Sequence, residues 1–427
     1  MGDAPRRIED GRRQGIVSGL MVAQTTLVHD PEPAGAAEAG GDLALVLSGG
    51  GARAAYQVGL LRHLAKRHPD LPVQVLTGVS AGAINVSMLA AHPGSFADAV
   101  DELVELWIGL RAQDVFSTEG RSLLRHVASW GTRLVTGGRR VGRGGKGMVD
   151  TQPLRRLLTH ALHARRNGEI PGLERKLRAG PLKAVATTTL NYATGQTVTW
   201  VQGRDIVDWE RTNRKSVKAR LTVEHVMASS ALPLVFPAVR LGRDWHGDGG
   251  VRMAAPLSPA LHLGARRILA VSTRYQRTPQ EEDRPRTFGY PPPVQILGQL
   301  MNAVFLDVLD EDVLRLERIN RLIAKLPPEE RGGLEPVGIL GLRPSVDLGV
   351  LAAEYEPKLP RFFKFLTRGL GTKETASPDF LSLLMFQPDY LRKVIEIGEA
   401  DAESRADQID ALVRQPAGSN DKMLSVG

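Results

Sequence analysis

A serine enclosed by glycines is the first feature of this sequence that could do chemistry. The segment Gly78-Val-Ser-Ala-Gly82 follows the apolar run 73–77 and precedes the apolar run 81–91. A Gly-x-Ser-x-Gly motif at a strand-to-helix turn holds its serine in a strained backbone and presents the hydroxyl at a helix N-terminus. These residues predict Ser80 as a nucleophile. The alternative is that Ser80 only caps the helix.

A glycine loop lies upstream, also between a strand-like and a helix-like segment. It reads Gly49-Gly-Gly-Ala-Arg53. Acyl transfer needs backbone N–H donors aimed at the developing oxyanion, and we expect Gly50 and Gly51 to supply them. The same loop also fits the dinucleotide fingerprint G-x-G-x-x-G/A through Ala54. That fingerprint requires an acid at the end of the second strand, where this chain has Ser80, so nucleotide binding is disfavoured.

The third feature is an aspartate followed by two glycines, Gly247-Asp-Gly-Gly250. By itself this is a turn sequence. Beside a serine nucleophile it gains a second meaning, because Asp248 can accept the hydroxyl proton directly where no histidine intervenes. A Ser-Asp-His triad is the competing arrangement, with His262 as its best-placed histidine. The spacing of His262 with Leu257 and Leu261 favours helix packing instead.

Together these motifs resemble the patatin-like phospholipases, in their bacterial form. The family carries a Gly-Gly-Gly-x-Arg/Lys loop, a Gly-x-Ser-x-Gly elbow and a distant Asp-Gly-Gly, in this order. The resemblance extends over residues 42–275 and includes the segment 228–237 before the aspartate. It departs from the family at Ser48, where many members have Asp, at Ala54, where many have Gly, and at Ala254, where many have Asn.

This resemblance implies a catalytic dyad of Ser80 and Asp248 and an oxyanion hole at Gly50 and Gly51. Arg53 would order that loop or meet a lipid phosphate. The remaining motif glycines are Gly49, Gly78, Gly82, Gly249 and Gly250.

The implied function is hydrolysis of lipid esters, of the phospholipase A or lysophospholipase type. Transfer of the acyl group to an alcohol and non-catalytic lipid binding are the alternatives. The chain has no cysteine, and its carboxylates do not cluster at metal-ligand spacings. We therefore expect neither a metal nor another cofactor.

The elements that must position these residues follow an α/β pattern. The apolar runs 43–47, 73–77 and 266–273 predict buried parallel strands, and the spacing within 57–67 and 81–91 predicts helices. A strand pair is expected at 182–189 and 196–201, then a helix at 223–231. The fold class is α/β, and the resemblance implies three α/β/α layers around a mainly parallel central sheet.

The chain divides by composition into four parts. Residues 1–41 predict a disordered leader, and 42–275 the catalytic α/β domain. Residues 276–413 predict a Pro-rich linker and a helical C-terminal extension, in which the phenylalanines of 362–386 either pack the helices or form an interfacial patch. Residues 414–427 predict a flexible tail.

Positive charge is concentrated in one segment. The chain has a net charge of +8 and a pI near 9.8. Segment 121–183, a basic insert in the catalytic domain, carries fifteen Lys or Arg against three acids. It predicts contact with an anionic membrane surface, or else solvated helix faces. No nucleic-acid partner is expected, because no binding signature accompanies the charge.

Targeting signals are weak. The chain has no continuous apolar run of about 18 residues, the length needed to span a bilayer. The arginines of 6–13 and the apolar run 16–23 imitate a signal peptide, but Asp3, Glu9 and Asp10 interrupt the basic part. We expect a cytoplasmic protein that is peripheral at the membrane, with export as the alternative.

Overall fold

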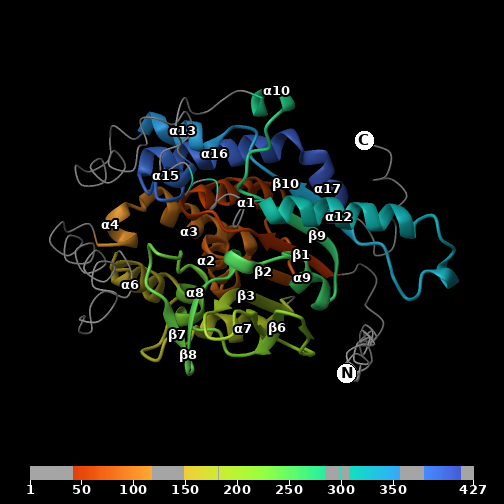
Figure 1. Ribbon diagram of the computed structural model, residues 1–427, viewed down its shortest axis with the longest axis horizontal. Coiled ribbons are helices and arrows are strands. Elements are labelled where there is room, and N and C mark those ends of the chain that lie inside the picture. Colours follow the sequence, from red (N-terminus) through yellow and green to blue (C-terminus); the bar gives the residue numbers. More distant parts are fainter. Residues whose placement is uncertain are drawn as a thin grey trace, which may run out of the picture. The chain divides into compact units, whose positions relative to one another are not determined.

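In the computed structural model the strands of the described residues form one sheet, with helices on both of its sides (Figure 1). The structure describes residues 42–117, 149–180, 182–283, 296, 299, 307–355 and 379–414. The strands are β1 (Asp42–Leu47), β2 (Val75–Val79), β3 (Ala184–Asn191), β4 (Thr197–Gly203), β5 (Glu210–Arg211), β6 (Arg214–Lys218), β7 (Val239–Leu241), β8 (Asp244–Asp248), β9 (Ala265–Val271) and β10 (Gly338–Leu342).

The sheet is parallel across its centre. Its order is β10-β9-β1-β2-β3-β4-β6-β5, and the first five strands are mutually parallel. Strand β3 then pairs antiparallel with β4, and also with β8, which forms a hairpin with β7. The mixed α/β fold with a mainly parallel central sheet is therefore confirmed.

Strand β1 shows why both faces of the sheet are buried. Leu43, Leu45 and Leu47 point into one hydrophobic cluster, whereas Ala44 and Val46 belong to another on the opposite face. Side chains alternate across a strand, so an unbroken apolar run requires cover on both sides. This is the three-layer arrangement that the resemblance implies.

The first cluster lies beneath most of the helices. It is formed with α1 (Ala55–Arg67), α2 (Ala81–Ala91), α3 (Phe96–Gly109), α4 (Ala112–Val115), α6 (Gln152–Ala161), α7 (Pro171–Ala179), α8 (Val223–Ser229), α13 (Leu348–Tyr355), α15 (Asp379–Leu383), α16 (Pro388–Ser404) and α17 (Ala406–Arg414). The second cluster is formed with α9 (Ser258–His262) and α12 (Asp307–Ile323). The short helices η1 (Gly51–Ala54), η2 (Gly249–Arg252), α10 (Pro279–Glu282) and η3 (Pro328–Glu330) lie in connections.

The C-terminal part joins this core directly. Strand β10 extends the sheet beside β9, and α16 packs along α1 (Figure 1). Gly59 and Gly398 allow that packing, because a side chain at either position would collide with the backbone of the facing helix. We expected only helices after the Pro-rich segment. The short run Gly338–Leu342 contains two glycines, which hide its strand character in the sequence.

Candidate active site

The turn between β2 and α2 places Ser80 at the carboxyl edge of the sheet. Ser80 has φ 56° and ψ −129°, a strained conformation for a residue with a side chain. A Cβ at Gly78 would lie 2.4 Å from the carbonyl oxygen of Gly82, and one at Gly82 would lie 2.3 Å from that of Leu47. Both glycines are therefore needed for the chain to turn this sharply.

The glycine loop 49–51 passes beside the serine. A Cβ at Gly49 would lie 3.0 Å from the Cβ of Ser80. Gly50 and Gly51 have φ values of 151° and 53°, which favour glycine. Among the described residues, no acceptor binds the amides of Gly50 or Gly51, and both residues line the same cavity as Ser80.

Arg53 is buried behind this loop. Arg53 is only 3% exposed, and its Nε donates to Ser382 Oγ at 2.5 Å. The sequence left two roles open, ordering the loop or meeting a lipid phosphate. Its burial and this bond favour the first role.

Asp248 ends β8, opposite Thr189 of β3, and is fully buried. Burial raises the pKa of its carboxyl group to about 7, although the hydroxyl of Ser80 and the amide of Gly250 both lower it. Oδ1 accepts the Gly250 amide at 2.9 Å, whereas Oδ2 is buried without a hydrogen bond of standard geometry. The Ser80 hydroxyl thus lies close enough to the carboxyl group to lower its pKa, although the geometry is not that of a standard hydrogen bond.

Three histidines near these motifs have other contacts. His262 stacks on Trp209 with ring centroids 4.8 Å apart, and burial lowers its pKa to about 4. His246 bonds Thr189 Oγ1 through Nδ1 at 3.0 Å, and His225 lies edge-on against Trp200. These contacts favour structural roles for the three rings over a place in a Ser-Asp-His triad.

An apolar cavity of about 60 Å³ opens at Ser80. It lies on the face of the sheet covered by the first cluster, and Gly50 and Gly51 form part of its wall. Its apolar lining includes Ile84, Leu106, Trp107, Leu110, Leu154, Leu158, Leu232, Phe236, Leu383, Leu384 and Phe386. A hydrocarbon chain attached to a carbonyl at Ser80 would contact these side chains.

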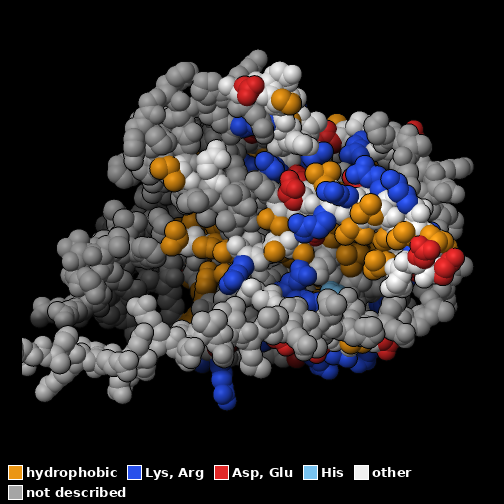
Figure 2. Space-filling view, turned by 45° about the vertical axis from the view of Figure 1, so that its right-hand side comes forward, with side chains coloured by type: hydrophobic (Ala, Val, Ile, Leu, Met, Phe, Trp, Pro, Cys, Tyr) orange, Lys and Arg blue, Asp and Glu red, His pale blue; other side chains and the backbone are white. Residues whose placement is uncertain are grey.

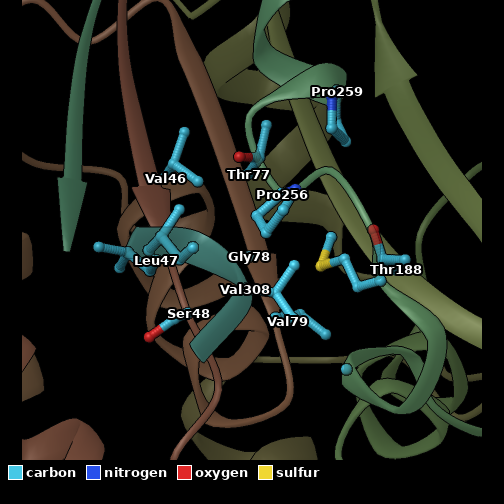
Figure 3. A pocket seen from close by; sticks show the side chains of 13 residues that line it. Val46, Leu47, Ser48, Thr77, Gly78, Val79, Thr188, Pro256, Pro259 and Val308 are labelled. Atoms are coloured by element: carbon cyan, nitrogen blue, oxygen red, sulfur yellow. The ribbon is translucent and has the colours of Figure 1, made fainter. Parts of the chain in front are cut away.

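A second, smaller cavity of about 20 Å³ lies behind the elbow (Figure 3). Figure 3 shows its wall, built from the ends of β1 and β2, Thr188 of β3, the segment with Pro256 and Pro259, and Val308 of α12. It therefore lies between the carboxyl edge of the sheet and the first turn of α12, whose Leu309 also packs against the sheet.

Comparison with known proteins identifies the family. Residues 45–261, just over half of the chain, match the model of the patatin-like phospholipases. The chain belongs to the patatin-like phospholipase family. No curated protein matches this patatin-like chain.

Solved structures give a weaker likeness. VipD from Legionella pneumophila is 13% identical, with 86% of this chain and 67% of that one covered and a TM-score of 0.37. Human GIVD cytosolic phospholipase A2 is 11% identical, with 88% and 60% covered and a TM-score of 0.43. The patatin-like chain thus spans three-fifths of the length of the human protein.

Two groups of residues at this patatin-like site are not predicted from the sequence. Ser229 and Ser230, at the end of α8, contact the backbone of Ser80. Ser382 and Leu383 of α15 support the glycine loop from outside the residues that match the family. The similarity of segment 228–237 to bacterial members was the available signal for the first group. The second gave no signal, since a lone serine in a C-terminal helix carries no motif.

The basic segment is only partly described, because residues 121–148 lie outside the described residues. Among its described cations, four pair with acids: Arg155 with Glu224, Arg165 with Glu169, Arg178 with Glu174, and Lys183 with Asp42. These pairs reduce the charge available to a membrane. Outside this segment, the exposed Arg315, Arg318 and Arg321 of α12 accompany the exposed Leu314 and Leu322. Figure 2 shows Lys and Arg side chains next to hydrophobic ones on one face of the molecule.

Three further predictions concern the C-terminal phenylalanines, membrane-spanning helices and metal-binding groups. Phe380 and Phe386 are buried, whereas Phe362, Phe363 and Phe365 lie outside the described residues. Within the part of the chain that the structure describes, no helix has the length and apolar content to cross a membrane. The same part holds no group of three or more His, Asp or Glu arranged for a metal ion.

Proposed function

We propose that this chain is a serine acyl hydrolase that cleaves lipid esters, of the phospholipase A or lysophospholipase type. One observation carries the proposal: the strained Ser80 and the glycine loop line one apolar cavity, and the buried carboxyl group of Asp248 interacts with the Ser80 hydroxyl. Membership of the patatin-like family supports it. Each group has a place in ester cleavage, and none needs a metal or a cofactor.

The first step forms an acyl-serine. The ester carbonyl lies against the amides of Gly50 and Gly51, and Asp248 accepts the Ser80 proton as Oγ attacks the carbonyl carbon. The amides stabilise the negative charge that develops on the carbonyl oxygen. The proton on Asp248 then passes to the departing alcohol, which in a phospholipid is a glycerol hydroxyl.

The second step releases the acyl chain. Water, or a second alcohol in a transfer reaction, gives its proton to Asp248 and attacks the acyl carbonyl carbon. Asp248 returns this proton to Ser80 Oγ as the bond between the acyl group and Oγ breaks, which releases the product and restores the dyad. A base with a pKa of about 7 suits both directions, since it can accept and return a proton near neutral pH. The apolar cavity holds the chain in both steps.

We place the enzyme in the cytoplasm, acting peripherally at membranes. The substrate is held in aggregates, so the enzyme must reach a lipid surface. Among the described residues of segment 121–183, the exposed Arg156, Arg166 and Arg175 lie outside the ion pairs given above and support attraction to anionic lipid.

Release of fatty acid from phospholipid vesicles tests the function. We expect activity in the wild type and a loss of at least about 1,000-fold in both Ser80→Ala and Asp248→Asn, because each removes a group that acts in the transition state. Ser87→Ala, on the same helix but outside the cavity, is the matched control. Full activity in purified, folded Ser80→Ala would refute the proposal. Added glycerol or lysolipid as acceptor distinguishes transfer from hydrolysis.

A further inference from the structure

The end of α8 makes contact with both members of the proposed dyad. Ser229 Oγ accepts the backbone amide of Ser80 at 3.0 Å, and Ser230 Oγ donates to the carbonyl of Ser80 at 3.0 Å. One residue further on, the carbonyl of Ala231 accepts the backbone amide of Asp248 at 3.0 Å. Three consecutive residues thus bind the backbone of the nucleophile on both sides and the backbone of the base.

Strand β3 provides a second link between the same two residues. Val79, which precedes Ser80, pairs with Thr188, and Thr189 pairs with Asp248. Ser229 Oγ donates to the carbonyl of Thr188 at 2.7 Å, so the end of α8 is also fixed to this strand. The separation of Ser80 and Asp248 is therefore set by a closed circuit of backbone contacts through β3 and residues 229–231.

We infer that Ser229 and Ser230 are positioning residues, which hold the backbone of Ser80 at the orientation from which its hydroxyl reaches Asp248. The inference rests on the proposed function of the dyad. From here on we call residues 229–231 the dyad clamp. In this role each serine acts through the backbone of Ser80, although Ser230 also borders the cavity.

A dyad has a particular need for such a clamp. In a triad, a histidine ring lies between the serine and the acid and is oriented by the acid, so the backbone can place the two at some distance. In a dyad the hydroxyl must reach the carboxylate itself. A misplacement of about 1 Å can reduce a rate about 100-fold, and the strained φ of Ser80 would relax if nothing held it.

The burial and hydrogen bonds of the dyad clamp also support a positioning role. Ser229 is fully buried and Ser230 nearly so. Ser230 caps the end of α8 through its backbone N–H, so neither hydroxyl is used to cap that helix. The Ser229 hydroxyl makes two hydrogen bonds, one to the backbone of Ser80 and one to the backbone of Thr188. It thereby ties both segments to α8. A buried hydroxyl used only to fill space would not need to accept from Ser80 of the elbow and also donate to Thr188 of β3.

The rate at which a fluorophosphonate labels Ser80 tests the clamp. The reagent reports the reactivity of the serine hydroxyl without dependence on the lipid substrate. We expect Ser229→Ala and Ser230→Ala to label about 10-fold to 100-fold more slowly than the wild type. Turnover of a soluble ester should fall equally in kcat, with KM nearly unchanged. Ser230→Thr, which keeps a hydroxyl, should regain most of the rate.

The control is Ser87→Ala on α2. Ser87 is as buried as Ser229, but its hydroxyl has no hydrogen-bond partner among the described residues, so its removal should leave labelling unchanged. Thermal unfolding of every variant shows that it is folded at the assay temperature. Should Ser229→Ala fail to fold, Ser230→Ala gives the same test, since among the described residues the Ser230 hydroxyl bonds the carbonyl of Ser80 alone.

The outcomes separate the clamp from the function. Slow labelling in both alanine variants, with normal labelling in Ser87→Ala, supports the clamp. Labelling within twofold of the wild type in folded Ser229→Ala and Ser230→Ala overturns the clamp and leaves the dyad standing. Absence of labelling in the wild type overturns the proposed function itself.

Discussion

Arg53 and Ser382 are joined by a hydrogen bond from Nε to Oγ at 2.5 Å, although 329 positions separate them in the sequence. In the same contact, Gly51 approaches Leu383 so closely that a Cβ at Gly51 would lie 2.2 Å from the Leu383 carbonyl oxygen. The residues that match the family end at 261. The glycine loop is thus held by a helix that lies outside them.

Removal of the Ser382 hydroxyl should therefore weaken catalysis from a distance. We expect Ser382→Ala to lower kcat about 10-fold, because the donors of the glycine loop lose part of their preorganisation. Loss of one buried hydrogen bond should also reduce the free energy of unfolding by about 1–3 kcal/mol. Steady-state kinetics on a soluble ester and urea unfolding measure the two effects. Ser404→Ala, at an exposed serine of α16, should change neither. Unchanged kcat in Ser382→Ala would show that the loop needs no support from α15.

The pH dependence of activity should follow the ionisation of Asp248. In the proposed mechanism the carboxylate is the active form, and burial raises its pKa to about 7. Protonation therefore removes the base as the pH falls through neutrality, and kcat/KM should rise with pH and level off above about pH 8. At pH 6 it should be about a tenth of its plateau. A profile that stays flat from pH 5.5 to pH 8 would mean that Asp248 ionises as an ordinary aspartate.

The same pKa predicts a gain in stability from an inactivating change. Because the pKa of Asp248 is higher in the folded state than in the unfolded chain, this group destabilises the fold progressively as the pH rises from about 4 to about 7. The Asp248→Asn variant has no ionisable group at this position and therefore lacks this pH-dependent destabilisation. Its free energy of unfolding, relative to that of the wild type, should increase by about 2–3 kcal/mol between pH 5 and pH 8. Urea unfolding of both proteins at the two pH values measures it. A constant difference would contradict the raised pKa.

The sequence predicts the motifs of this site better than it predicts their supports. The glycines around Ser80 and Asp248 are recognisable because a sharp turn or a close backbone approach tolerates little else. The strand β1 is recognisable because burial on both faces demands an unbroken apolar run. Ser229 and Ser382 act through single hydrogen bonds to segments far away in the chain. Such contacts depend on tertiary packing and leave no periodicity to detect.

The size of the cavity should set the preference for acyl chains, and Ile84 offers a way to change it. Ile84 lies one turn after Ser80 on α2 and lines the cavity of about 60 Å³. Ile84→Trp would fill much of that space. We expect kcat/KM to fall at least about 10-fold for an octanoyl ester, through the loss of contacts worth about 0.8 kcal/mol per buried methylene group, and to change little for an acetyl ester. Nitrophenyl esters of both lengths provide the measurement. Ile84→Val, which barely alters the volume, should keep the wild-type ratio. An equal loss for both esters in Ile84→Trp would mean that the tryptophan disturbs Ser80 itself and that the acyl chain lies elsewhere.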